Sequence, residues 1–311
     1  MAKKIILDCD PGHDDAIALM LAYANPEIDL VAVTTVAGNQ TLTKVTNNAR
    51  SIATLIGMKD VPIAAGCDRP LVNEINVADE IHGDSGIDGT ELPKPEVPLQ
   101  DIHAVDLIIE TIMNSPEKTI TLVPTGALTN IAMAARREPK IVDRVKEVVL
   151  MGGGYLESNY SAAAEFNIFV DPEAARVVFN AGWKLTMVGL DVTHKALATP
   201  DVLEEMEKIN TVPSIKVKEL MTFFQKMYKE SQDFDYPPVH DPVTVAYLID
   251  PSVMEVVKAP IDIELHGELT RGMTVVDFNH IVASDCVTYV GVSLDKQKFW
   301  DLVYDALRKI G

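Results

Sequence analysis

Four carboxylates lie close together near the start of the chain, in the segment DCDPGHDD. An apolar run ends in Asp8 and Asp10, a Pro-Gly turn follows, and Asp14 and Asp15 open a helical pattern. Clustered carboxylates repel one another unless protons or a cation compensate them. Oxygen ligands without a cysteine or histidine cluster favour Ca²⁺ or Mg²⁺ over zinc or copper. We therefore predict a metal site at this strand-to-helix junction.

A purely structural role for these residues is the main alternative. Asp14 and Asp15 could cap a helix and complement its dipole, which is a sufficient explanation for one or two carboxylates but not for four. Asp8-Cys9-Asp10 is formally a DxD, as in Mg²⁺-dependent phosphohydrolases with an Asp nucleophile. Such haloacid-dehalogenase-like enzymes usually continue DxDGT, whereas this chain continues PGHDD. Neither GxGxxG nor GxxxxGK[ST] follows the first strand, so a dinucleotide or P-loop site has no support.

Composition limits the class of protein. The 311 residues are 47% hydrophobic, which is enough for a large core in one α/β domain or two smaller ones. A net charge of -19 argues against nucleic acid or anionic membranes as partners. The three cysteines are far apart, which suggests neither a disulfide framework nor a zinc knuckle. Without a signal-peptide pattern or a long apolar run, we expect a cytoplasmic protein.

The elements that must position the carboxylates alternate along the chain. Short Val-, Ile- and Leu-rich runs alternate with helical patterns, which predicts a mainly parallel, Rossmann-like α/β sheet covered by helices. The expected strands are 5–9, 30–36, 61–65, 119–123, 147–151, 185–190, 261–265, 273–278 and 287–292. The expected helices are 14–24, 43–56, 104–114, 129–137, 172–181, 243–248 and 296–308.

Two longer segments interrupt this alternation. Residues 68–101 are rich in Pro, Gly and acidic residues, as in an active-site lid, a binding loop or a disordered segment. Residues 199–236 have apolar positions three and four apart and predict a helical elaboration beside the sheet. With no repeat and no Gly/Ser linker, we expect one domain spanning residues 1–311.

The opening motif DCDPGHDDAIAL closely resembles the signature of the inosine-uridine preferring nucleoside hydrolases. Further segments that resemble this family, in family order, are VAGNQT at 36–41, IHGDSGIDG at 81–89, LVPTGALTNIA at 122–132, VLMGGG at 149–154, AAEFNIFVDPEAA at 163–175, GLDVTHKA at 189–196 and VHDPVTVAYL at 239–248. The resemblance implies the nucleoside hydrolase fold, a tightly held Ca²⁺, a homotetramer or homodimer, and hydrolysis of ribonucleosides to ribose and free base in purine and pyrimidine salvage or catabolism.

The resemblance also implies the metal ligands. They are Asp10, Asp15, Asp241 and the main-chain carbonyl of Thr125. Asp241 precedes a proline, and this Asp-Pro pair alone reads equally well as a helix N-cap followed by a first-turn proline. The same capping interpretation applies more strongly to Asp171, which also precedes a proline.

The implied reaction passes through a ribosyl oxocarbenium-like transition state, so the site must activate water, hold ribose and protonate the departing base. Asp10 is the candidate general base, with direct displacement and inversion. The ribose ligands implied by the resemblance are Asp14, Asn39, Asn159, Glu165, Asn167 and Asp241. Asn39 and Asn159 could equally be ordinary turn residues. Glu165 and Asn167 would share one face around Phe166, a further substrate contact, if the segment is extended.

The side that faces the base is predicted from histidines. His240 is the candidate proton donor to the leaving nitrogen, since histidine can donate a proton near neutral pH. His82 is a second candidate near the base, and Tyr228 could line the same face. Met151 is expected against the ribose. A lone tyrosine on an amphipathic helix and a methionine at a strand end are more often part of the hydrophobic core.

Two further expectations concern specificity and supporting residues. His13 could orient an aspartate. The histidines expected to be structural are His103, His194, His266 and His280. The loops at 76–90 and 223–240 should select the base. The presence of His82 and His240 resembles the inosine-uridine or pyrimidine-preferring branch of the family, which implies a broad or pyrimidine-leaning enzyme that cleaves uridine, cytidine and inosine. Deoxyribonucleosides should be poor substrates because a hydroxyl contact is missing. The alternative from another class is a non-catalytic protein that binds calcium and nucleosides.

Overall fold

Eight strands form the central sheet of the computed structural model, which describes residues 2–283 and 285–311. The strand order is β3-β2-β1-β4-β5-β6-β10-β7, and every neighbouring pair is parallel except the antiparallel pair β10 and β7. The strands of this sheet are β1 (Lys3–Cys9), β2 (Ile28–Thr35), β3 (Ile63–Ala65), β4 (Ile120–Pro124), β5 (Glu147–Met151), β6 (Leu185–Val188), β7 (Met254–Lys258) and β10 (Thr288–Leu294). The predicted mainly parallel sheet is confirmed.

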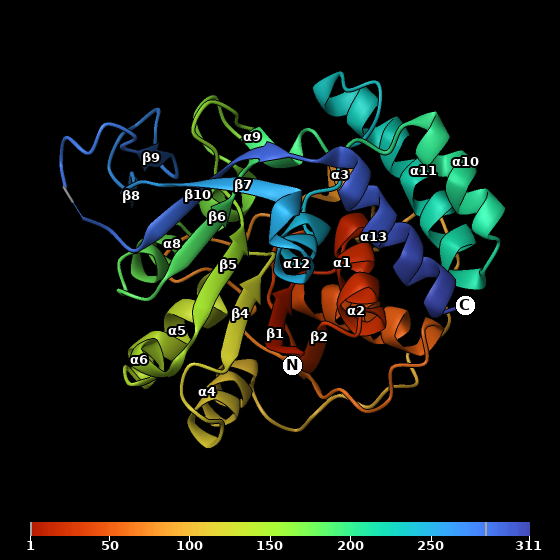
Figure 1. Ribbon diagram of the computed structural model, residues 1–311, viewed down its shortest axis with the longest axis horizontal. Coiled ribbons are helices and arrows are strands. Elements are labelled where there is room, and N and C mark those ends of the chain that lie inside the picture. Colours follow the sequence, from red (N-terminus) through yellow and green to blue (C-terminus); the bar gives the residue numbers. More distant parts are fainter. Residues whose placement is uncertain (1, 284) are drawn as a thin grey trace.

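Helices cover both faces of the sheet (Figure 1). They are α1 (His13–Ala24), α2 (Leu42–Leu55), α3 (Asp79–His82), α4 (Ala104–Asn114), α5 (Thr129–Arg137), α6 (Ile141–Arg144), α7 (Phe166–Val170), α8 (Pro172–Phe179), α9 (Leu190–Thr193), α10 (Pro200–Ile209), α11 (Val212–Gln232), α12 (Pro242–Ile249) and α13 (Lys296–Lys309), with a 3-10 turn at Pro251–Val253. In Figure 1, α4, α5 and α6 lie on one side and α1, α12 and α13 on the other, with α10 and α11 beyond them.

The alternation of side chains along β1 explains how one strand serves two cores. Ile5 and Leu7 are fully buried in the cluster that contains α1, α12 and α13. Ile6 points to the opposite face and is buried with residues of α4, α5 and α8. Successive side chains of a strand point to opposite faces, so a strand buried on both sides reads as a continuous apolar run.

The carboxyl ends of β1 and β4 mark the functional edge of the sheet. From β1 the chain adds β2 and then β3 on one side, while β4, β5 and β6 follow on the other. This reversal of strand order opens a crevice at the carboxyl ends of the two middle strands, where open α/β sheets bind ligands. Asp10 follows β1 and Thr125 follows β4, so both lie at this point.

Several predicted boundaries were wrong. The strand expected at 185–190 ends at Val188, and the short helix α9 follows it. The segments at 261–265 and 273–278 contain β8 (Ile261–Ile263) and β9 (Thr274–Val276), which form a separate two-stranded sheet. Strand β7 was not predicted; it is an edge strand whose Glu255, Val257 and Lys258 are exposed, so its apolar pattern is weak.

The two interrupting segments match their expected character. Residues 199–236 contain two helices, α10 and α11, separated by a turn in which Asn210 has positive φ. The Thr211 side chain caps α11 by accepting a hydrogen bond from the Ser214 amide, which explains why a new helix begins there. Residues 68–101 are mostly irregular and include only the single-turn helix α3. Among the described residues, no helix is long and apolar enough to cross a membrane.

Candidate active site

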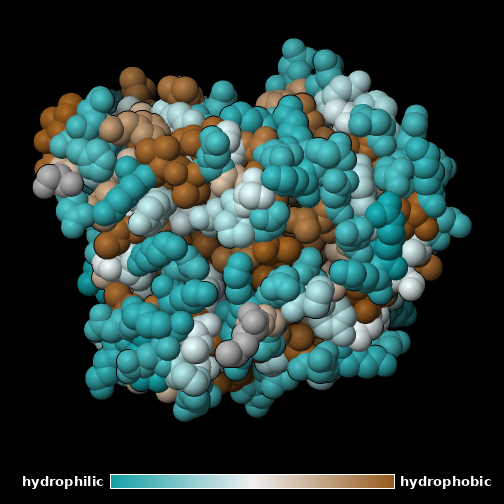
Figure 2. Space-filling view, in the orientation of Figure 1, coloured by the Kyte–Doolittle hydropathy of each residue, from teal (hydrophilic) through white to brown (hydrophobic). Residues whose placement is uncertain are grey.

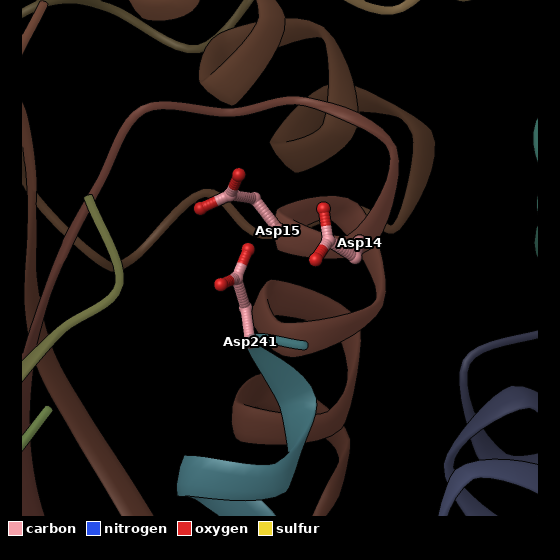
Figure 3. A group of neighbouring side chains, drawn as sticks. All are labelled: Asp14, Asp15 and Asp241. Carbon is pink, nitrogen blue, oxygen red and sulfur yellow. The ribbon is translucent and has the colours of Figure 1, made fainter. Parts of the chain in front are cut away.

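The starts of two helices far apart in the sequence bring three of the predicted carboxylates together. Asp14 and Asp15 lie in the first turn of α1, and Asp241 directly precedes α12. Oxygen atoms of these three carboxylates lie within 4.8 Å of one another. Figure 3 shows the side chains converging from the two helices. All three residues are buried. We call Asp10 and these three residues the carboxylate floor.

Asp10 lies beside this group, and one of its carboxylate oxygens has no hydrogen-bond partner among the described residues. The Asn39 amide donates to its Oδ2 at 2.7 Å, whereas its Oδ1 is buried and has no hydrogen-bond partner among the described residues. A Cβ at Gly38 would lie 2.1 Å from Oδ2, and one at Gly126 would lie 2.4 Å from Oδ1. Only glycine leaves room for the carboxylate in this position. A buried carboxylate oxygen without a partner requires a proton or a cation.

The other carboxylates of the floor are fixed by neutral donors. Asp15 accepts hydrogen bonds from the Gly12 amide, from Asn39 Nδ2 and from Thr125 Oγ1, at 3.0, 3.2 and 3.0 Å. Asp14 accepts from the His240 amide at 3.0 Å. No hydrogen bond in this set comes from a lysine or arginine, so the negative charge of the floor is not neutralised by a neighbouring cation of the described chain.

The two Asp-Pro junctions behave differently. Asp171 caps α8 by accepting from the Ala174 amide at 3.0 Å, and it also accepts from the Leu71 amide and Thr129 Oγ1. Asp241 occupies the cap position of α12 but makes no capping hydrogen bond, and its carboxylate turns toward Asp15. The capping interpretation therefore holds for Asp171 and is wrong for Asp241.

Burial dominates the electrostatics of the floor. It raises the pKa of Asp14 to about 7, and the neighbouring charge of Asp15 adds to this shift. Burial also raises the pKa of Asp10 and that of Asp241 well above the ordinary value, again with contributions from neighbouring aspartates. Carboxylates with this behaviour hold protons or bind a cation at neutral pH. The residues present thus fit a hard metal ion.

Thr125 presents its carbonyl toward the residues predicted to hold the ribose. That oxygen accepts a hydrogen bond from Asn167 Nδ2 at 2.9 Å, and the same Nδ2 lies 3.3 Å from the sulfur of Met151. Asn159 lies nearby and accepts from the Phe166 amide through its Oδ1 at 2.9 Å. These predicted side chains therefore surround one space.

Glu165 and Asn167 do not lie on an extended strand, which corrects the conditional prediction. Helix α7 begins at Phe166, and Glu165 caps it by accepting from the amides of Asn167 and Ile168 at 2.9 and 3.1 Å. The Gly153 amide also donates to Glu165, at 2.9 Å. Burial raises the pKa of Glu165 to about 7. The two side chains reach the pocket from a helix N-terminus.

Histidine and aromatic side chains form the opposite side, which we call the aromatic wall: His82, Phe224, Tyr228 and His240. His240 Nδ1 lies 2.8 Å from Thr193 Oγ1, and His240 Nε2 lies 2.8 Å from the Tyr228 hydroxyl. Both ring nitrogens of His240 are therefore engaged. Burial lowers its pKa well below the ordinary value, so the imidazole is neutral. Burial raises the pKa of Tyr228, whose phenol keeps its proton.

One pocket of about 600 Å³, counted to its open mouth, lies between floor and wall. Its lining includes every predicted substrate contact, together with Thr125 and His240, but not Asp10 and Asp15. Lining residues that the sequence did not predict are Ala78, Glu80, Ile81, Tyr160, Phe224 and Gln232.

His13 does not orient an aspartate, so that prediction was wrong. Its Nδ1 lies 3.1 Å from His82 Nδ1, and its Nε2 lies 2.8 Å from the carbonyl oxygen of Asp88. Its ring stacks on Phe224. The contact with Asp88 depends on how the 83–89 loop returns to α1, which no local pattern at residue 13 could reveal.

Comparison with known proteins gives a consistent family assignment. The sequence profile described as "Inosine-uridine preferring nucleoside hydrolase" matches residues 5–301. The chain is 57% identical over 312 residues to the inosine-uridine preferring nucleoside hydrolase of Crithidia fasciculata, covering 100% of this chain and 99% of that protein. It is 45% identical to the pyrimidine-specific ribonucleoside hydrolase RihA of a Shewanella species, covering 99% and 96%.

A solved structure supports the same relationship. The purine-preferring ribonucleoside hydrolase from Gardnerella vaginalis superimposes with a TM-score of 0.93 and is 32% identical, with 99% of each chain covered. The predicted resemblance is thus confirmed by sequence and by fold.

Proposed function

The chain belongs to the inosine-uridine preferring nucleoside hydrolase family and is a nucleoside N-ribohydrolase, and we propose that it works with Ca²⁺ on a broad or pyrimidine-leaning set of ribonucleosides. The observation that carries the metal part is the unpartnered, buried Oδ1 of Asp10 beside the three converging carboxylates. Ribose and free base are the products.

Asp10, Asp15, Asp241 and the carbonyl of Thr125 would hold the ion. An all-oxygen set that includes a main-chain carbonyl suits Ca²⁺, whose coordination is flexible, better than Mg²⁺, which keeps more of its waters. Bound there, the ion would lower the pKa of a water molecule and orient it together with the ribose hydroxyls. Asp14 lies in the same carboxylate group and lines the pocket, and the family resemblance assigns it instead to the ribose.

Asp10 serves as the general base. The Asn39 amide holds its Oδ2, and Oδ1 has no partner among the described residues, so the carboxylate would contact both the ion and the water beside it. As a metal-bound carboxylate it would take a proton from that water while the ion balances the local charge. The water then attacks the anomeric carbon directly, which gives inversion of configuration.

The ribose is held by side chains that are already fixed before substrate arrives. Glu165 is pinned by three main-chain amides, and Asn167 is pinned through Thr125. Preorganised acceptors and donors of this kind bind adjacent hydroxyls in pairs, and they lose a contact when one hydroxyl is missing. Deoxyribonucleosides should therefore be poor substrates.

His240 donates the proton that the leaving base requires, and Tyr228 completes its hydrogen bonding. The 2.8 Å contact between His240 Nε2 and the Tyr228 hydroxyl allows a proton to move between the two groups at the pocket surface. Both residues line the pocket; the phenol of Tyr228 keeps its proton at neutral pH, and His240 is a neutral imidazole that carries one N–H hydrogen. The departing base leaves as a neutral molecule, which lowers the barrier to bond cleavage.

The range of bases is proposed from two considerations. Relatives that share the overall architecture carry names ranging from purine-preferring to pyrimidine-specific, so the fold alone does not select the base. His82 and His240 both line the pocket, and their presence resembles the inosine-uridine or pyrimidine-preferring branch of the family, which supports a substrate set that includes uridine, cytidine and inosine.

The phosphohydrolase alternative has no support. Asp8, the first residue of the formal DxD, accepts hydrogen bonds at Oδ1 from Thr34 Oγ1 at 2.6 Å and from Asn130 Nδ2 at 2.8 Å. It is buried and does not line the pocket, so it is not placed to act as a nucleophile. The family assignment also excludes this class, and it excludes the non-catalytic alternative for this chain.

Assembly and cellular role follow as further parts of the proposal. We expect a homodimer or homotetramer that serves nucleoside salvage or catabolism in a reducing compartment, which suits three free cysteines. Figure 2 shows hydrophobic atoms gathered at the upper left, over the region of β8 and β9. Exposed side chains of that region are Val275, Phe278, Ile281 and Val282. Light scattering measures the oligomeric state.

The decisive experiment follows ribose release from uridine, cytidine, inosine and adenosine by the purified protein with Ca²⁺ and without phosphate. We expect ribose from at least uridine and inosine, and a loss of about 10³-fold or more in Asp10→Ala. Circular dichroism checks that the variant is folded. Uridine cleavage well below that of both purine nucleosides would contradict the pyrimidine-leaning preference, and full activity after calcium chelation would contradict the metal assignment.

A further inference from the structure

Two histidines outside the proposed proton-transfer pair face each other beside the pocket. His13 and His82 approach through their Nδ1 atoms at 3.1 Å. Two ring nitrogens at this distance share a single proton, because two N–H groups would collide and two lone pairs would repel. The position of that proton decides what His82 presents to the pocket.

The hydrogen bond at Nε2 of His13 determines which ring carries the shared proton. Its Nε2 lies 2.8 Å from the main-chain oxygen of Asp88, which can only accept a hydrogen bond. Nε2 of His13 therefore carries the hydrogen, and Nδ1 of a neutral His13 is a bare acceptor. His82 must then donate from its own Nδ1, which leaves its Nε2 without a hydrogen. His82 lines the pocket, so this lone pair is available to a ligand.

Packing holds both rings in this arrangement. His13 is stacked between Phe223 and Phe224, with ring planes 3° and 4° from parallel and centroids 5.4 and 4.6 Å away. Gly12 lets the His82 ring lie against the loop, because a Cβ there would be 2.4 Å from His82 Nδ1. Both rings are buried, and among the described residues no carboxylate oxygen is hydrogen-bonded to either of them. Both imidazoles are neutral, as the assignment of one shared proton requires.

We propose that His13 is a positioning residue that fixes His82 in the Nδ1–H tautomer, so that His82 Nε2 accepts a hydrogen bond from an N–H group of the substrate base. This inference rests on the proposed function, because it takes the aromatic wall to be the side that receives the base. Hypoxanthine carries such a group at N1 and uracil at N3, whereas adenine and cytosine have a lone pair at the same positions. His82 is thereby a determinant of specificity and not a proton donor from Nε2.

The tautomer is measured without turnover. Long-range ¹H–¹⁵N correlation spectra of the ¹⁵N-histidine-labelled enzyme with Ca²⁺, assigned with His82→Gln and His13→Gln, report which nitrogen of each ring is protonated. We expect His82 to be protonated at Nδ1 and His13 at Nε2. A His82 protonated at Nε2 in the wild-type enzyme overturns the inference, even if nucleosides are hydrolysed normally. Absence of hydrolysis with the expected tautomers would instead contradict the proposed function alone.

The substrate consequence is tested with nearly isosteric pairs. In the wild-type enzyme, kcat/KM should favour inosine over adenosine and uridine over cytidine by about tenfold. With adenosine or cytidine, the lone pair of His82 Nε2 would face a lone pair of the base, and no hydrogen bond could form. His13→Phe keeps the stacked ring but removes the acceptor, so His82 can take either tautomer and both ratios should fall to about twofold or less. His13→Asn supplies an amide oxygen in place of Nδ1 and should restore the ratios.

Phe223→Leu is the matched control for packing, because it disturbs the stack without touching the two hydrogen bonds of His13. Its base ratios should equal those of the wild-type enzyme. Ratios that collapse in Phe223→Leu as far as in His13→Phe, or that stay unchanged in His13→Phe, would overturn the role assigned to His13.

Discussion

The carboxylate floor and the aromatic wall form two sides of one pocket and are built in opposite ways. The floor is charged, and its oxygens are held by main-chain amides and by Asn39 and Thr125 side chains, with Asp10 Oδ1 left over. The wall consists of neutral rings: both nitrogens of His240 have partners within the protein, and only Nε2 of His82 is left for a ligand. The carboxylates of the floor therefore require a bound cation or protons, whereas the wall requires neither.

This difference implies a division of labour. A site of unpaired carboxylates stabilises positive charge, such as a metal ion or the developing oxocarbenium ion of the ribose. A wall of neutral donors and acceptors can move one proton and recognise the edge of a base. Changes in the floor should abolish catalysis for every nucleoside, and changes in the wall should depend on the leaving group.

The largest effect is expected from the paired variants Asp241→Ala and Asp171→Ala. Both residues precede a proline at the start of a helix, but only Asp241 belongs to the floor. Asp241→Ala should lower kcat/KM by about 10³-fold or more and weaken Ca²⁺ binding. Asp171→Ala should lower the free energy of unfolding by about 1–2 kcal/mol, because it loses a cap, and leave kcat within about twofold.

Steady-state kinetics, calcium titration and thermal unfolding of the two variants separate these effects. Equal losses of activity in both, after correction for the folded fraction, would mean that the floor is not distinct from ordinary helix caps.

Calcium should stabilise the protein by an amount that grows with pH. The folded chain keeps protons on Asp10 and Asp241 at pH values where the unfolded chain has released them, so stability of the metal-free protein falls as pH rises from 7 to 8.5. Below about 6.5 the buried histidines, whose folded pKa is lowered, oppose this trend. Calcium replaces the protons, and at 100 times its Kd it should add about 2.7 kcal/mol at pH 8.

Thermal unfolding at pH 5.5, 7 and 8.5, with calcium or with a chelator, measures this prediction. The rise in Tm should be about 4 °C at the highest pH and smaller at pH 5.5, where protons compete with the ion. A calcium effect of equal size at all three pH values would show that the ion binds elsewhere than on carboxylates of raised pKa.

A change in the wall should act through the leaving group. His240→Ala should lower kcat for inosine and uridine by about 100-fold, the usual contribution of a positioned acid. The same variant should lose less than about threefold on 4-nitrophenyl riboside, because the nitrophenolate departs without a proton. His194→Ala is the matched control, since His194 lies 5.7 Å from His240 between ring centroids but does not line the pocket. Equal losses on both kinds of substrate would make His240 a binding residue only.

The same two regions explain how much could be predicted. The floor is concentrated in DCDPGHDD, and a strand end followed by a helix start fixes its place at the carboxyl edge of a parallel sheet. The alternating apolar runs likewise gave the order of most strands and helices. Asp241 needed the family resemblance, because its local sequence reads as a helix cap.

The wall was harder to predict because it depends on tertiary placement. Phe224 and Tyr228 share one face of α11, and their spacing alone does not distinguish a pocket lining from ordinary core. The five-residue helix α7 is too short to show periodicity, which is why Glu165 and Asn167 were expected on an extended segment. The partner of His13 is a main-chain oxygen in a distant loop, a contact without any sequence signal.

The smallest effect is expected from Tyr228→Phe. The hydroxyl of Tyr228 contributes one neutral hydrogen bond, to His240 Nε2, and such bonds are worth about 0.5–1.5 kcal/mol, or about two- to tenfold in rate. The loss should appear in kcat for nucleosides, while the calcium-dependent rise in Tm stays unchanged because the floor is untouched. Tyr247→Phe, on α12 and outside the pocket lining, is the control. A loss above about 100-fold would exceed what one such bond can contribute. It would identify the phenol as the group that protonates the base, with His240 behind it as the relay.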